Sequence, residues 1–111
     1  MVNDKSSPFG GWTRTTTLLA LSLMGESYPR QLSRLLAKPI FGVQEALAGL
    51  EKDELVAARP AGRTRLYQLN PRYFALTELR AYLARLAEPE TELRRRIDSL
   101  RRRPRRAGKR L

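Results

Sequence analysis

The stretch that decides the fold reads Tyr-Pro-Arg-Gln-Leu-Ser-Arg-Leu-Leu-Ala (28–37), Lys-Pro (38–39) and Ile-Phe-Gly-Val-Gln-Glu-Ala-Leu-Ala-Gly-Leu-Glu-Lys-Asp (40–53). In its first part Leu32, Leu35 and Leu36 fall on one helical face. In its last part apolar side chains stand at Val43, Leu47 and Leu50. This spacing is that of a second helix. The proline between them disfavours helix at the preceding residue, so a short turn separates the two helices.

The residues after this pair of helices predict a β-hairpin. Two alternating runs at 55–59 and 64–69 flank Pro60-Ala61-Gly62-Arg63, which has the composition of a turn. Two helices joined by a short turn, followed by a hairpin, form a winged helix-turn-helix, whose second helix can enter a DNA major groove. We further expect a helix at 13–24, whose leucines point in several directions and need cover on more than one side.

The expected fold class is mainly α with a small β-hairpin wing: a winged helix-turn-helix with a long C-terminal dimerisation helix. The chain has 111 residues and is 41% hydrophobic, which suits one domain with a small core. We expect a flexible lead at 1–11, the winged domain at 12–87, a basic coiled-coil-like extension at 88–103 and a disordered arginine-rich tail at 104–111.

A heptad pattern runs through the C-terminal third of the chain. After a helix expected at 74–87, Pro89 either opens a new helix or kinks a continuing one. The apolar spacing continues across it with steps of 4, 3, 7, 4 and 3 residues. The first half of this seam either packs on the chain's own domain or pairs with a second copy. Past Leu93 little of the domain should remain to pack against, so a partner helix is the better interpretation there. The expected dimer interface consists of Leu79, Leu83, Leu86, Leu93, Ile97 and Leu100.

The absence of certain residue types excludes several kinds of catalytic and metal-binding site. The chain has no cysteine and no histidine, which removes thiol chemistry, imidazole catalysis and the usual zinc sites. No Gly-rich phosphate loop or nucleophile-base pair appears, so we expect no enzyme, catalytic residue, metal or cofactor. The longest nearly apolar run, 18–24, is shorter than the roughly 20 residues that a bilayer needs. No apolar signal core is present near residue 1, so we expect a cytoplasmic protein without membrane contact.

The formal charge of +11 is concentrated at one end of the chain. Residues 1–93 hold 12 basic and 10 acidic side chains, whereas residues 94–111 hold 10 basic ones and a single acid, Asp98. Such a block attracts nucleic acid through phosphates without reading sequence. Alternatively it is a solubilising end. The expected phosphate-binding tail consists of Arg101, Arg102, Arg103, Arg105 and Arg106.

The run from Leu47 to Val56, together with Gly62-Arg63-Thr64-Arg65-Leu66-Tyr67-Gln68-Leu69-Asn70, resembles the prokaryotic ArsR-like winged-helix regulators. Those proteins commonly end the recognition helix with Leu-Glu-x-x-Gly-Leu-Val and carry a Gly-Arg-x-x-x-Tyr-x-Leu wing. The resemblance covers about residues 12–87. It implies a small dimeric, repressor-like protein whose third helix reads DNA and whose terminal helices pair the subunits.

The chain departs from that family in two respects. Glu54 stands where the family usually has glycine after the recognition helix, at a position that often needs a left-handed conformation. Glutamate there costs about 1 kcal/mol, unless the helix ends differently. Metal-sensing members bind metal through cysteine and histidine, which this chain lacks, so soft-metal sensing is not expected.

The expected recognition helix offers an outer face. With its apolar side inward, the residues that point outward include Phe41, Gln44 and Glu45, and Lys38 precedes them. Gln44 could pair with adenine and Glu45 could accept from cytosine, while Phe41 could touch a thymine methyl or a protein partner. For Gln44 and Glu45 the alternative is ordinary solvated surface. Phe41 could instead pack on the neighbouring turn.

Arginines mark the expected wing. Arg63 is at the tip, where it can reach phosphates or the minor groove, and Arg59 and Arg65 flank it or are solvated strand positions. On the first helix of the pair, Arg30 and Arg34 are expected to be solvated or to touch the DNA backbone.

These features favour a sequence-specific, repressor-like regulator that binds double-stranded DNA as a homodimer. The rival is an interaction or architectural protein whose winged helix binds a protein partner and whose tail binds nucleic acid non-specifically. RNA is a further target for an arginine-rich segment.

Overall fold

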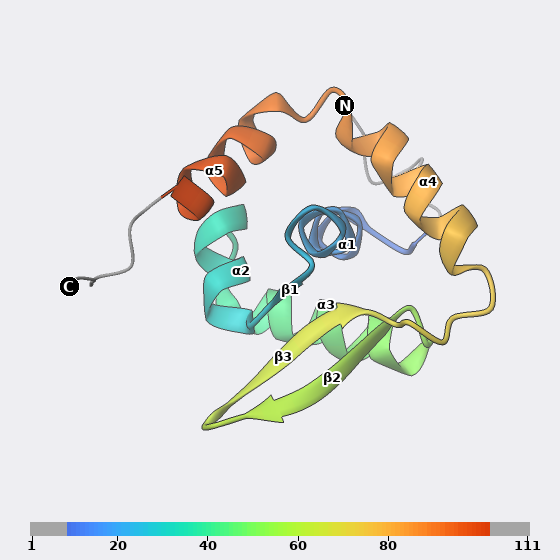
Figure 1. Cartoon of the computed structure of the whole chain (residues 1–111). Coiled ribbons are helices and arrows are strands. Elements are labelled where there is room, and N and C mark those ends of the chain that lie inside the picture. The colour runs from blue at the N-terminus through green and yellow to red at the C-terminus, as the bar shows by residue number, and fades with distance from the viewer. Residues whose placement is uncertain (1–8, 103–111) are drawn as a thin grey trace.

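The computed structural model describes residues 9–102. Helices and strands follow in the order α1 (Trp12–Met24), β1 (Glu26–Ser27), α2 (Pro29–Leu36), α3 (Ile40–Lys52), β2 (Val56–Ala61), β3 (Thr64–Leu69), α4 (Leu76–Ala87) and α5 (Thr91–Arg102). A hairpin that directly follows the second helix of a helix-turn-helix is the topology of a winged helix, and Figure 1 shows it extending away from the helices. The predicted mainly α fold with a small β-hairpin wing is confirmed, whereas the expected long C-terminal helix is two helices, α4 and α5.

The centre of the molecule is α1. Leu18, Leu19 and Ala20 are fully buried, and the hydroxyl of Thr15 stays satisfied in the core by donating to the carbonyl of Gly11 at 2.8 Å. Helices α2, α3, α4 and α5 and strand β3 all contact α1, and Figure 1 shows them arranged around it. The surplus of leucines on α1 is therefore covered by the chain itself.

The sheet is antiparallel with strand order β1-β3-β2. In the hairpin Val56 pairs with Leu69 and Ala61 with Thr64, which leaves a two-residue turn of Gly62 and Arg63. Gly62 has φ +64°, a conformation that glycine adopts without strain. The turn is shorter than the predicted 60–63 because β2 is an edge strand, where a proline needs no ladder partner for its nitrogen. The short strand β1, which joins β3, was not predicted.

The end of α3 adopts the conformation that its sequence disfavours. Glu54 has φ +67°, and the N–H of Leu55 returns to the carbonyl of Leu50 at 2.9 Å. The side-chain amide of Asn70, just after the wing, donates to the carbonyl of Glu54 at 2.9 Å. The helix thus ends as it would with glycine, and the non-glycine residue is held there by a hydrogen bond from the wing.

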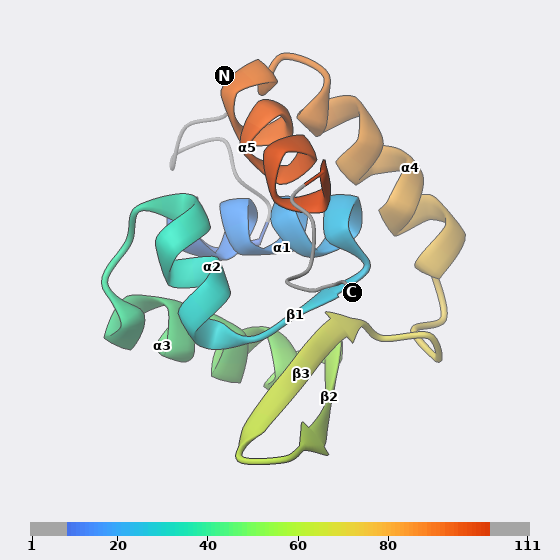
Figure 2. The same cartoon turned by 60° about the vertical axis from the view of Figure 1, so that its left-hand side comes forward.

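Pro89 opens a new helix. The helix α4 ends at Ala87 and α5 begins at Thr91, with the N–H of Glu90 bonded to the carbonyl of Ala87 at 3.0 Å across the break. Figures 1 and 2 show α5 turning back over α1 and toward α2, and contacts with both helices agree with this path.

Because α5 turns back onto α1 and α2, the residues of the expected dimer interface pack within the chain itself. Leu83 is fully buried, Leu79 is 7% exposed and Ile97 is 3% exposed, all within the chain's own core. The other three seam residues, Leu86, Leu93 and Leu100, pack against that core and are half-buried. The expectation that little of the domain remains to pack beyond Leu93 is wrong, because α5 returns to α1 and α2.

The segment before α1 is partly tied to the body. The ring of Phe9 lies 5.9 Å from that of Tyr82 on α4, and the carbonyl of Phe9 accepts a hydrogen bond from Nε of Arg14. The end of the expected flexible lead is therefore packed, and residues 1–8 lie outside the described part. Within 9–102 no helix is both long and apolar enough to cross a membrane.

Candidate nucleic-acid interface

The second helix of the pair, α3, presents a free face. Its inner side is Val43, Ala46, Leu47 and Leu50, all buried. Its outer side is Phe41, Gln44, Glu45 and Ala48, all exposed, with Phe41 exposed to 68%. The exposure of the predicted recognition face is confirmed, and its side chains are available to a partner molecule.

A tight turn sets α3 against α2. Ala37 adopts a left-handed conformation with φ +55°, and the N–H of Lys38 bonds to the carbonyl of Ser33 at 3.1 Å. The hydroxyl of Ser33 returns a hydrogen bond to the carbonyl of Lys38 at 2.5 Å. These reciprocal bonds fix the direction in which Pro39 starts α3. Lys38 is half-buried at the start of the outer face.

The wing carries one arginine that differs from the other two. Arg63, at the turn, is exposed and makes no hydrogen bond or ion pair with any residue of the described chain. Arg59 pairs with Glu26 at 3.1 Å, which ties β2 to β1. Arg65 pairs with Glu51 of α3 at 3.3 Å and lies over the ring of Tyr67, 5.8 Å from its centroid.

One of these ion pairs connects the wing to α3. The Arg65–Glu51 pair joins β3 to α3 and so connects the wing with the helix that carries the outer face. Figures 1 and 2 show α3 and the hairpin on one side of the molecule, with α4 and α5 on the opposite side. A rod-shaped ligand along α3 would approach the side of the molecule that carries the wing and not the side that carries α4 and α5.

The surface formed by α2, α3 and the wing is only weakly basic. Arg30, Lys52 and Arg63 are exposed cations without an ion pair in the described part of the chain, and Glu45 and Glu54 are exposed acids without one. Arg59 and Arg65 are already neutralised by acids that sequence reasoning did not connect to them. The pairing of Arg59 with a residue 33 positions away left no local signal that could have revealed it.

The C-terminal arginines are partly used inside the fold. Nη2 of Arg101 donates to the carbonyl of Leu23 at 2.6 Å, and Nη1 of Arg96 donates to the carbonyl of Leu35 at 3.0 Å. Each guanidinium thus satisfies a carbonyl in the last turn of α1 or α2, where cations are favoured. Of the other predicted tail residues, Arg102 ends α5, whereas Arg103, Arg105 and Arg106 lie outside the described residues.

Ion pairs link neighbouring turns of α5. Glu92 accepts hydrogen bonds from Arg95 at 2.7 Å and from Arg96 at 3.0 Å. The hydrogen bonds from these two arginines hold the pKa of the Glu92 carboxyl below its usual value. The same bonds raise the pKa of Arg95. Among residues 9–102 no three acidic side chains gather into a group that could hold a metal ion.

Comparison with protein-family models gave no match for this chain, and comparison with curated proteins gave no similar sequence.

Proposed function

We propose that this protein is a sequence-specific DNA-binding regulator that inserts α3 into the major groove and places the wing on the adjacent backbone. The observation that carries the proposal is the exposed outer face of α3, together with a wing that is joined to the same helix by the Arg65–Glu51 pair and has at its tip an arginine unpaired within the described chain. A helix presented by a tight turn is the element that helix-turn-helix proteins use for base contact. The resemblance to ArsR-like regulators supports the same role and adds that of a repressor.

Within this proposal the side chains divide into two groups. Gln44 and Glu45 offer the amide and carboxylate groups that discriminate bases, and Phe41 can meet a thymine methyl. Arg63, Lys38 and the exposed Arg30 supply phosphate contacts, which position the protein without reading sequence.

A homodimer is part of the proposal, because two copies would recognise a two-fold symmetric site. Its surface differs from the predicted seam, since Leu79, Leu83 and Ile97 are buried within one chain. Sedimentation velocity at micromolar concentration measures the assembly state directly.

A protein partner is the second candidate function, and one observation favours it. Phe41 is 68% exposed and the adjacent Ile40 is 37% exposed, which places apolar area at the start of α3, where DNA contact mostly needs polar groups. In this reading nucleic acid is held non-specifically by the C-terminal arginines.

Selection from random double-stranded DNA decides between the two. The full chain is incubated with a random duplex pool, and the retained DNA is sequenced. An enriched motif, palindromic for a dimer, supports the regulator. A featureless retained pool contradicts sequence reading and supports the interaction protein. The matched variant Gln44→Ala shows whether any motif depends on α3.

A further inference from the structure

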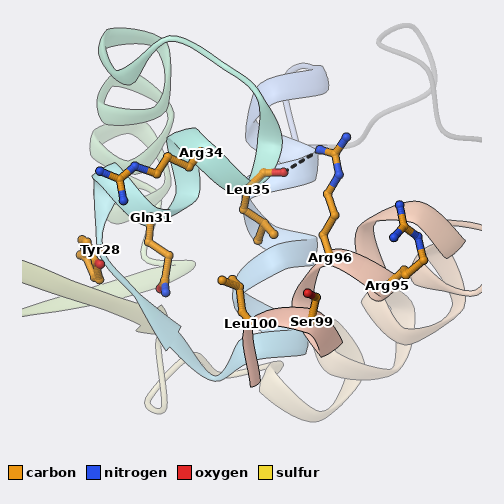
Figure 3. Close-up of a pocket in the computed structure, with 8 residues that line it drawn as sticks. All are labelled: Tyr28, Gln31, Arg34, Leu35, Arg95, Arg96, Ser99 and Leu100. Carbon is orange, nitrogen blue, oxygen red and sulfur yellow. Dashed lines mark hydrogen bonds between the residues drawn. The ribbon is translucent and has the colours of Figure 1, made fainter. Parts of the chain in front are cut away.

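A groove of about 370 Å³ lies between α2 and α5. The side chains on its α2 side are Tyr28, Gln31 and Arg34, and Arg95 and Arg96 come from α5 (Figure 3). Leu35 and Leu100 lie between the two polar sides. The groove is separate from the outer face of α3, because α2 lies between α5 and α3 in Figures 1 and 2.

The lining of the groove is rich in hydrogen-bond donors and contains no acid. Three of its residues are arginines. On the α5 side Arg95 and Arg96 share the carboxylate of Glu92, so that group of three retains one positive charge. On the α2 side, no side chain or carbonyl of residues 9–102 pairs with the guanidinium of Arg34.

Two further residues of the α2 side of the groove carry hydrogen-bond donors. Oε1 of Gln31 is occupied by the hydroxyl of Ser27 at 2.6 Å, which leaves the amide N–H groups of Gln31 for another acceptor. The hydroxyl of Tyr28 has no partner in the described chain. A guanidinium, an amide and a hydroxyl on one side of a groove are donors that suit the oxygens of a carboxylate or phosphate.

From this arrangement we infer that the groove is a binding site for a small organic anion. Its carboxylate or phosphate head pairs with Arg34 and the neighbouring donors, and its apolar body lies on Leu35 and Leu100. An apolar floor with a few polar groups at one end is the usual composition of a small-molecule site. The site is a different one from the proposed DNA face, and its occupancy is measurable without DNA.

Isothermal titration calorimetry of the full chain tests the site with four probes. These are 2-naphthoate, 2-naphthyl phosphate, neutral 2-naphthylmethanol and inorganic phosphate. We expect saturable binding of at least one naphthyl anion and much weaker binding of the neutral alcohol and of inorganic phosphate. Whichever naphthyl anion binds more tightly identifies the head group.

A matched pair of variants locates the binding. Arg34→Gln removes one positive charge from the groove, and Arg80→Gln removes another exposed helical arginine, on α4, that also has no partner within 9–102. Arg34→Gln should weaken the naphthyl anion about tenfold, as expected for the loss of a charge-assisted hydrogen bond. Arg80→Gln should bind like the wild type, and amide chemical shifts of Leu35 and Leu100 should move during the titration.

Three results would each overturn the assignment. One is the absence of saturable binding by both naphthyl anions, and another is equal binding of the anions and the neutral alcohol. The third is an equal effect of Arg34→Gln and Arg80→Gln. Since no DNA is present, these outcomes are independent of whether α3 reads sequence.

Discussion

Gly49 of α3 lies directly beneath the guanidinium of Arg14, so that a Cβ atom added to Gly49 would overlap Nη1 of Arg14. The close approach lets Arg14 reach across α3 to Asp53, with a distance of 2.6 Å between Nη2 and Oδ2. The absence of a side chain at one position of α3 thus permits the ion pair that joins α1 to the end of α3.

The first prediction concerns this pair. Gly49→Ala should stabilise the Arg14→Ala variant by about 1 kcal/mol, because alanine is the better helix former. In the wild type the gain should be smaller, since the new methyl group displaces Arg14 from Asp53. A double-mutant cycle from urea denaturation should give a coupling of about 0.5–1 kcal/mol. Gly42→Ala, in the same helix with open space around it, should have the same effect in both backgrounds.

The second prediction concerns the left-handed residue after α3. Glu54→Gly should raise the free energy of unfolding by about 1 kcal/mol, because glycine adopts φ +67° without strain. Glu45→Gly, in the helical interior, should lower it by a similar amount. Asn70→Ala should lower it by about 1 kcal/mol through loss of the bond to the Glu54 carbonyl. Loss of stability in Glu54→Gly would contradict the left-handed assignment.

The third prediction separates the core from a dimer seam. Ile97→Ala should lower the free energy of unfolding by about 2–4 kcal/mol, because Ile97 is buried in the chain's own core. The adjacent exposed residue gives the control, since Asp98→Ala should change stability by less than about 0.5 kcal/mol. Sedimentation should show the same assembly state for the wild type and for folded Ile97→Ala. A variant of Ile97 that dissociates without losing stability would restore the seam.

The fourth prediction tests the wing against DNA. Each phosphate contact contributes about 0.9 to the slope of log affinity against log salt concentration. Arg63→Gln should flatten that slope by about 0.9, because Arg63 is free to contact a phosphate. Arg59→Gln should change it less, because Arg59 is already paired with Glu26. Equal slopes for Arg63→Gln and wild type would remove the wing tip from the DNA contact.

The fifth prediction tests base reading. Gln44→Ala should reduce the preference for a selected site over random DNA by about 1–3 kcal/mol at one base step, with little change in salt slope. Competition binding at a fixed salt concentration measures this preference. Arg63→Gln serves as the reverse control, since it should weaken both DNAs equally. An unchanged preference in Gln44→Ala would show that Gln44 is solvated surface.

Local periodicity predicted the winged helix well. The spacing of Val43, Leu47 and Leu50 identifies the inner face of α3, and the outer face follows from it because a helix fixes both. Gly62 likewise marks the wing turn, since few other residues accept its φ. These inferences succeed because each depends on neighbours along the chain.

The packing of segments that are far apart in the sequence could not be predicted in the same way. The spacing of Leu93, Ile97 and Leu100 suits a partner helix and the chain's own core equally, and only the path of the chain after Pro89 decides between them. The acid that pairs with Arg59 and the two sides of the α2–α5 groove also come from distant segments. Hydrophobic periodicity carries no information about contacts between segments that are far apart in the sequence.

The enclosed position of α1 has a consequence for biosynthesis. The run Leu18–Leu21 is made early, yet part of its cover comes from α4 and α5, which are made much later. At about 5–20 residues per second, the interval between synthesis of Leu21 and of Ile97 lasts several seconds. During that time α1 of the nascent chain lacks part of its final cover. The C-terminal helices therefore determine when folding on the ribosome can finish, and how long chaperones can engage the unfinished domain.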